Sequence, residues 1–317
     1  MPRRTGAAAA RYHVAVVDQN VNEVRVFDRN AKAWDDDAII WSFKGVDHWL
    51  DHGWADLSDA KIRKTRSRDL IALVAASGGG VGIVDIKKEG EKANSDNDLI
   101  WSAHPEGNPH AIERIPDNGS ILAAGSEGTL HLYSPRDPDD IDDFNRYDKN
   151  NSWDFPGAHG ILWDPRTKST QEDGVLWVLG DGKLVGYKVR GKGMDTDLDR
   201  WRTVEIRHDG HKMGHDLQPD YVNKGRLLLT DSEGVYGYDV NTDKLVIGED
   251  EELWGKNRVK SIARHSSGEF VWVVGSKDTG EMGTHVSFGT KLGAATDERG
   301  WKDARFYKAR IFSPAYE

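Results

Sequence analysis

The sequence predicts an all-β protein folded as a single β-propeller of six four-stranded antiparallel blades. Short strand-like runs alternate with glycine and aspartate turns throughout, and no segment shows a long helical period. The chain has 34 glycines and 12 tryptophans, which suits an all-β protein with many turns. A four-strand unit recurs every 45–55 residues, as in propellers. Seven blades are the alternative. Two β-sandwiches fit less well, because the period continues across the middle without a linker.

Hairpins are the most visible part of each unit, and each has a glycine-containing or short polar turn, as tight β-loops require. They lie at 12–18 with 23–28, 70–77 with 80–86, 121–134, 175–189, 227–240, and 270–276 with 284–289.

A further strand follows each of the first five hairpins and often carries tryptophan: 38–43, 99–103, 152–155, 201–206 and 251–254. Another strand precedes most hairpins. It would be the innermost strand of its blade and line the central channel. Six units therefore begin near residues 12, 61, 110, 159, 215 and 260.

We expect residues 1–11 to form a tail and 12–317 to form the propeller domain. The first unit lacks an innermost strand of its own. The segment RFYKARIF (305–312) could supply that strand and close the ring, or it could be the outer strand of the last blade.

Counting along the repeat gives a register for the innermost strands. The interval from His110 to Ser126 equals the interval from His215 to Asp231. It also equals the interval from Lys260 to Ser276. Five basic residues are thereby predicted at equivalent positions around one channel mouth: Lys61, His110, His159, His215 and Lys260. His159 fits this register if residues 167–173 form a longer loop.

The composition limits the partners. A formal net charge of -10 disfavours nucleic acid and anionic membranes, and no apolar run is long enough to span a bilayer. The absence of cysteine excludes disulfides and thiolate metal sites. We expect a soluble monomer. The N-terminal residues show no signal-peptide pattern, and both secreted and cytoplasmic locations stay open.

Five stretches together resemble a propeller family largely described as a domain of unknown function: VVDQNVNEVRVFD (16–28), WADLSDAKIRK (54–64), SGGGVGIVD (77–85), NPHAIERIPDNGSILAA (108–124) and FYKARIF (306–312). More distantly, the chain is similar to propeller polysaccharide lyases that act on oligogalacturonate, ulvan or rhamnose–glucuronate glycans. This similarity implies histidines with tyrosine or arginine at the channel mouth. Some of those lyases bind a divalent metal there through several histidines.

Three chemistries suit such a ring of basic residues. First, His110, His159 and His215 could bind a divalent metal, since imidazole suits several of these ions, although the two lysines would repel a cation. Second, the histidines could be acid or base in β-elimination from a uronate, with Tyr221 as proton donor and with Lys61, Lys260 and Arg264 on the carboxylate. Third, the ring could bind an anionic glycan or a protein without chemistry.

The loop before Lys61 adds two candidates, His52 and Trp54, which could form a sugar-stacking wall beside the mouth, although packing is an equally good interpretation of the tryptophan. The first prediction is thus a lyase of a uronate-containing oligosaccharide or polysaccharide. The alternative is a non-catalytic propeller that binds an anionic glycan or a protein partner.

Overall fold

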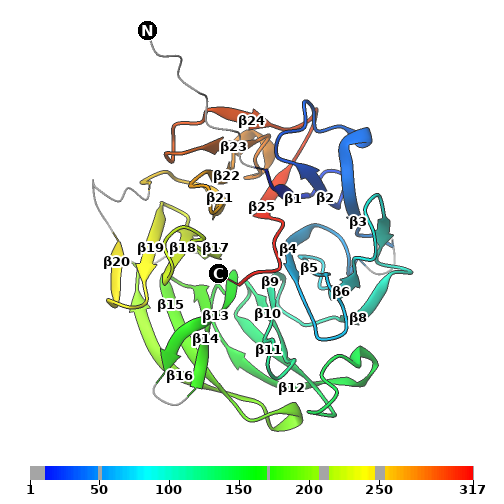
Figure 1. Cartoon of the computed structure of the whole chain (residues 1–317), viewed down its shortest axis with the longest axis vertical. Helices are drawn as coiled ribbons and strands as arrows, with labels where there is room; N and C mark the ends of the chain where they lie inside the picture. The colour runs from blue at the N-terminus through cyan, green and yellow to red at the C-terminus, as the bar shows by residue number, and fades with distance from the viewer. Residues whose placement is uncertain (1–10, 49–51, 170–171, 207–213, 247–253, 317) are drawn as a thin grey trace.

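Six β-sheets surround a central axis in the computed structural model, which describes residues 11–48, 52–169, 172–206, 214–246 and 254–316 (Figure 1). Each sheet contains one blade of four antiparallel strands, one sheet has a fifth, parallel strand, and the predicted six-bladed propeller is confirmed. The predicted tail at 1–11 lies, apart from Arg11, outside the described residues. Among the described residues, no helix has the length and apolarity needed to cross a membrane.

The first three blades, from the innermost strand outward, are as follows. Blade 1 is β25 (Phe306–Ile311), β1 (His13–Asp18), β2 (Glu23–Asp28) and β3 (Ile39–Lys44), extended in parallel by β7 (Lys92–Asn94). Blade 2 is β4 (Leu57–Arg63), β5 (Ile71–Ala76), β6 (Val81–Asp85) and β8 (Leu99–Ala103). Blade 3 is β9 (Pro109–Arg114), β10 (Ile121–Gly125), β11 (Thr129–Pro135) and β12 (Tyr147–Asp154).

The other three follow the same order. Blade 4 is β13 (Gly160–Ser169), β14 (Glu172–Gly180), β15 (Lys183–Arg190) and β16 (Asp197–Glu205). Blade 5 is β17 (Gly214–Pro219), β18 (Arg226–Asp231), β19 (Val235–Asp239) and β20 (Lys244–Val246). Blade 6 is β21 (Val259–Arg264), β22 (Phe270–Val274), β23 (Val286–Gly289) and β24 (Asp297–Arg299).

Short 3-10 turns are the helical elements of the described part: η1 (Asp36–Ala38), η2 (Phe144–Arg146), η3 (Gly193–Asp195) and η4 (Lys277–Thr279). Of the outer strand predicted at 251–254, residues 251–253 lie outside the described part.

The last strand closes the ring. β25 pairs antiparallel with β1, from Val14 opposite Ile311 to Asp18 opposite Phe306, and is thereby the innermost strand of blade 1. The first of the two predicted closures is confirmed. The other is wrong, because β24 is the outer strand of blade 6. Figure 1 shows this red strand beside the blue β1 at the centre of the molecule.

The second strands of blades 2 and 3 are apolar on both faces. β5 (IALVAA) and β10 (ILAAG) are buried at every position, because each face packs on a neighbouring blade. Burial on both faces explains why these strands read as continuous apolar runs rather than alternating ones.

The innermost strands differ, because the face that points into the channel is polar. β4 reads LSDAKIR and is buried throughout, although three of its seven residues are charged. Its apolar side chains Leu57, Ala60 and Ile62 join the core shared with blade 1. Its charged side chains must find partners inside the channel, since a buried unpaired charge is very costly.

Candidate functional site

A β-bulge interrupts five of the six innermost strands at one shared register. In β4, Leu57 pairs with Ala76 and Asp59 pairs with Ala75, so Ser58 has no partner residue on β5. The pairings of β9, β17, β21 and β25 skip one residue in the same way. A bulge redirects the side chain of the extra residue. In these strands the extra residue lies at the mouth of the channel where the strand begins.

A left-handed backbone residue lies two positions before the bulge in several blades. Asp56, Asn108, Gly157 and Arg258 all have φ between 54° and 64°. Glycine, asparagine and aspartate accept this conformation most easily. The recurring turn residue before the histidines in the sequence therefore has a backbone cause.

Five side chains occupy the bulge register, and together with His159 at the start of β13 we name them the mouth ring. His159 belongs to the mouth ring because it directly precedes Gly160, which pairs with Leu179. The carbonyl of Leu179 also accepts a hydrogen bond from the His159 N–H. The members of the mouth ring are between 0 and 9% exposed: Ser58, His110, His159, His215, Lys260 and Tyr307.

The structure brings four of the five predicted residues together but corrects the fifth. Asp59 pairs with Ala75, sixteen residues on, whereas the equivalent Ala111 pairs with Ala124, thirteen residues on. The longer β4–β5 hairpin shifts the count by three residues, so Ser58 takes the ring position and Lys61 lies deeper in the channel. Tyr307, the sixth member, was missed because the role of β25 was unsettled.

Three of the rings pack against one another. The imidazoles of His110 and His159 are stacked with centroids 4.4 Å apart and an interplanar angle of 20°. The His215 ring meets His159 edge-on at 5.7 Å. The Tyr307 hydroxyl is 2.8 Å from His110 Nδ1, and His159 Nδ1 donates to Gly157 O at 2.9 Å.

This packing does not support the predicted metal site. A zinc–imidazole bond lies in the plane of the ring and is about 2.0–2.1 Å long. The lone pairs of two nearly parallel rings 4.4 Å apart do not converge on one ion at that distance. Within the described part of the chain, no group of three histidine or acidic residues has a geometry that could hold a metal ion.

The histidines of the mouth ring are held neutral. Burial lowers the pKa of His159 to about 4, with Lys308 and Lys260 acting in the same direction. Burial also lowers the pKa of His110 and His215 well below 6.5, as do the neighbouring histidines and the same two lysines. Burial lowers the pKa of Lys260 as well. The ring therefore presents neutral imidazoles beside lysine side chains.

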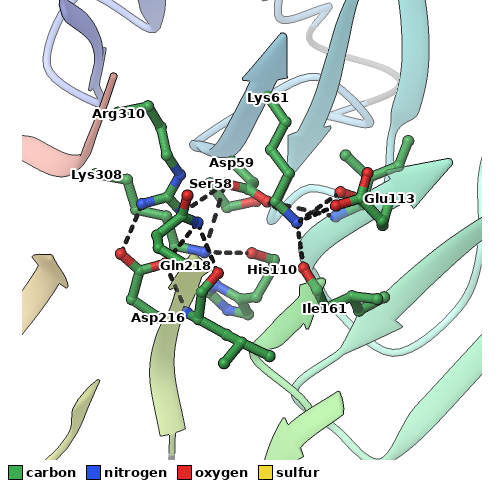
Figure 2. A network of polar contacts seen from close by, with 12 residues as sticks. Ser58, Asp59, Lys61, His110, Glu113, Ile161, Asp216, Gln218, Lys308 and Arg310 are labelled. Atoms are coloured by element: carbon green, nitrogen blue, oxygen red, sulfur yellow. Dashed lines mark hydrogen bonds and ion pairs between the residues drawn. The ribbon is translucent and has the colours of Figure 1, made fainter. Parts of the chain in front are cut away.

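Below the ring, buried charges fill the channel (Figure 2). Arg310 bridges blades 2 and 5, because its guanidinium donates to Asp59 at 2.8 Å and to Asp216 at 2.6 Å. Arg63 binds both oxygens of Glu113 at 2.8 and 2.6 Å. We call the set the channel column, and its members are at most 4% exposed: Asp59, Lys61, Arg63, Glu113, Asp216, Lys308 and Arg310.

Two lysines of the column have distinct roles. Lys61 donates to the carbonyls of Ile112 and Ile161 at 2.9 and 2.5 Å and lies 3.7 Å from Glu113. It is a structural side chain. It does not lie in the mouth ring, where the sequence analysis predicted it. Lys308 donates to the carbonyl of His110 at 2.8 Å, directly beneath the ring, and burial lowers its pKa to about 8.

Tyr221 and Arg264 lie at the opposite mouth. From His215, β17 runs to its end at Pro219, roughly 13 Å at 3.3 Å per residue, and Tyr221 lies two residues further on. Its hydroxyl donates to Ala315 O, and Arg264 pairs with Asp220 at 3.3 Å. The predicted roles of these two residues at the histidine site are therefore wrong.

The C-terminal segment covers that opposite mouth. Tyr316 donates to Arg114 O, and its ring lies 4.2 Å from the Arg63 guanidinium carbon. Figure 1 shows the segment crossing the centre of the propeller after β25. The mouth with the histidines is thus the end of the channel that this segment leaves uncovered.

The two candidates from the loop before β4 separate. Trp54 is 7% exposed and packs edge-on against Phe43, so it is a core residue and not a stacking wall. His52 is exposed, and its Nδ1 lies 2.7 Å from the Asp47 carboxylate.

Comparison with known proteins gives a family without a known activity. A model described as a family of unknown function (DUF6528) matches residues 21–282. No curated protein matches the chain. The resemblance to a propeller family of unknown function is confirmed, whereas neither result links the chain to polysaccharide lyases.

Proposed function

For this chain, which belongs to the family of unknown function DUF6528, we propose that the mouth ring binds the carboxylate of an acidic sugar. The observation that carries the proposal is the shared bulge register, which brings Lys260, His110 and His215 to one mouth, where His159 stacks on His110. Six pseudo-equivalent positions hold no acidic residue, although the chain as a whole is acidic.

The charge beneath the ring favours the same ligand. The channel column has four cationic side chains and three carboxylates, so it offers no excess of negative charge below the mouth. Lys260 adds a further amine at the mouth itself. A cleft lined by one sign of charge attracts the opposite sign even in a protein of the same net sign as the ligand.

The hydrogen-bond pattern orients the donors. When Tyr307 donates to Nδ1 of His110, the proton of the neutral imidazole resides on Nε2, which then can donate to a ligand oxygen. His159 is oriented in the opposite tautomer, because its Nδ1–H is bound to Gly157 O. Its Nε2 is an acceptor for a sugar hydroxyl.

A binding measurement tests the proposal. We expect galacturonate to bind by isothermal titration calorimetry and galactose not to bind. Lys260→Gln should weaken galacturonate binding about tenfold, or about 1.4 kcal/mol. The exposed Lys256→Gln is the control with the same charge change and should leave affinity unchanged. Equal affinity for the two sugars, or for the wild type and Lys260→Gln, contradicts the proposal.

Uronate β-elimination is a second candidate function, favoured by the contact between Tyr307 and His110. In this step Nε2 of His159, the free acceptor, removes the proton on the carbon next to the carboxylate, and Lys260 stabilises the resulting negative charge. The C4–O bond then breaks, a C4=C5 double bond forms, and the leaving oxygen takes the proton from Nε2 of His110. Tyr307, rather than Tyr221, is the tyrosine with a place at this site.

The ultraviolet absorbance of the unsaturated product separates the two functions. For a lyase, absorbance rises with oligogalacturonate or a glucuronate glycan, and Tyr307→Phe and His110→Gln each slow the rise by about 100-fold or more. If the wild type binds these glycans and the absorbance stays flat, the ring binds without catalysis.

A further inference from the structure

A cavity opens beside the mouth ring, at the same mouth of the propeller and between blades 6 and 1. Its volume is about 500 Å³, within the range of small-molecule sites. The residues that line it come from the β1–β2 turn, the β22–β23 connection and the segment before β25: Asn20, Thr279, Thr284, Trp301, Asp303 and Arg305.

This cavity and the mouth ring share two walls. Arg305 lies two residues before Tyr307 of the ring, and its carbonyl accepts from Gln19 of the β1–β2 turn at 2.9 Å. Lys260 of the ring lies against the β22–β23 connection, because a β-carbon built on Gly275 would be 3.3 Å from its Cε. The two sites are therefore neighbours on one face.

Two donors of the lining, on Arg305 and Trp301, have no partner within the described residues. The Arg305 side chain is exposed and makes no ion pair with any described residue. The indole N–H of Trp301 is buried and lacks an acceptor among the same residues. Asn20 adds an amide and Asp303 a carboxylate, whereas the hydroxyls of Thr279 and Thr284 already bind Met282 O and His285 Nδ1.

We infer that this cavity is a second sugar subsite, which holds the uronate unit adjacent to the one bound at the mouth ring. A guanidinium binds a carboxylate through two parallel hydrogen bonds, so Arg305 is the residue that recognises the second carboxylate. Sugar hydroxyls match the mixed donors and acceptors around it. The inference rests on the proposed function of the ring and adds that the ligand is an acidic oligosaccharide rather than a single sugar.

A comparison of chain lengths tests the subsite. We expect the wild type to bind trigalacturonate about tenfold more tightly than galacturonate in calorimetry. Arg305→Gln should remove this gain and leave the affinity for galacturonate unchanged. The control is Lys302→Gln, an exposed neighbour outside the cavity lining with the same charge change, and it should keep the gain.

The outcomes distinguish the subsite from the ring. Lys260→Gln should weaken both ligands by the same factor, because both place one carboxylate in the ring. If wild type binds galacturonate but gains nothing from the trimer, or if Arg305→Gln keeps the gain, the subsite is wrong and the ring proposal survives. If neither ligand binds, the ring proposal fails and the subsite fails with it.

Discussion

The hydroxyl of Tyr307 lies 2.8 Å from Nδ1 of His110, although 197 positions separate the two residues in the chain. Tyr307 belongs to β25, the strand that closes the ring, and His110 belongs to blade 3. The contact therefore exists only when the propeller is closed, and it joins the closure of the fold to the geometry of the candidate site.

Removing this hydroxyl should reduce both stability and binding. Tyr307→Phe leaves Nδ1 of His110 buried without a partner, which typically costs about 1–3 kcal/mol. Urea unfolding should show this loss, and calorimetry should show weaker galacturonate binding because the tautomer of His110 is no longer fixed. A variant as stable as wild type with unchanged affinity would mean that the contact orients nothing.

Breaking the central bridge of the channel column should have a larger effect. Arg310→Met removes the cation between Asp59 and Asp216, two carboxylates that are at most 1% exposed. Loss of one partner of a buried ion pair costs about 3–5 kcal/mol. The matched control is Arg136→Met, whose pair with Asp148 is exposed to solvent and whose loss should leave the urea midpoint unchanged. Similar midpoints for the two variants would refute the bridge.

Acid should destabilise the protein through the buried histidines. The pKa of His159 is about 4 in the folded state, against about 6.5 for an unfolded chain. Below pH 6.5 the unfolded state binds a proton that the folded state does not, so stability falls as the pH decreases from 6.5 toward 4. For His159 alone, lowering the pH from 7 to 5 should cost about 2 kcal/mol.

Two substitutions test that assignment. His159→Asn keeps a donor for Gly157 O and should reduce the pH dependence of the unfolding free energy between pH 7 and 5 by the contribution of one histidine, while His110 and His215 keep theirs. His52→Asn, at an exposed position, should retain the wild-type slope. Parallel slopes for wild type and His159→Asn would rule out His159 as a source of the acid sensitivity.

Metal removal should leave the site intact. Because the His110 and His159 rings are stacked rather than convergent, dialysis against EDTA should change neither the melting temperature nor galacturonate affinity. Readdition of zinc or manganese should have no effect either. A melting temperature that falls with EDTA and recovers with one of these ions would restore the metal interpretation.

The repeat was readable because every blade has the same hairpin at its centre, and His110, His159, His215 and Lys260 could be aligned by counting. Counting failed at Lys61, since it assumes equal hairpin lengths and the β4–β5 hairpin is longer. The structure corrects this through pairing partners, which no single sequence contains. Ser58 also gives no chemical signal as a ring member, because serine is common in strands and turns.

The sequence analysis also misjudged how far along a strand some candidate residues lie from the mouth ring. Tyr221 and Arg264 follow ring residues closely in sequence, but a strand carries them to the opposite mouth. Trp54 lies near the mouth in sequence, yet its packing on Phe43 depends on how blades 1 and 2 meet. Tyr307 could have been found from the sequence only by choosing the closure in which RFYKARIF is the innermost strand.

The closure by β25 also constrains how the protein is made. One edge of β1 pairs with β2 as soon as both leave the ribosome, but the other edge waits for Phe306–Ile311. At about 5–20 residues per second, synthesis of the intervening chain takes roughly 15–60 s. During that time the nascent chain carries an open strand edge, the kind of surface that pairs with other chains. Until β25 is made, the open edge of β1 is thus the part of the nascent chain most in need of shielding from other strands.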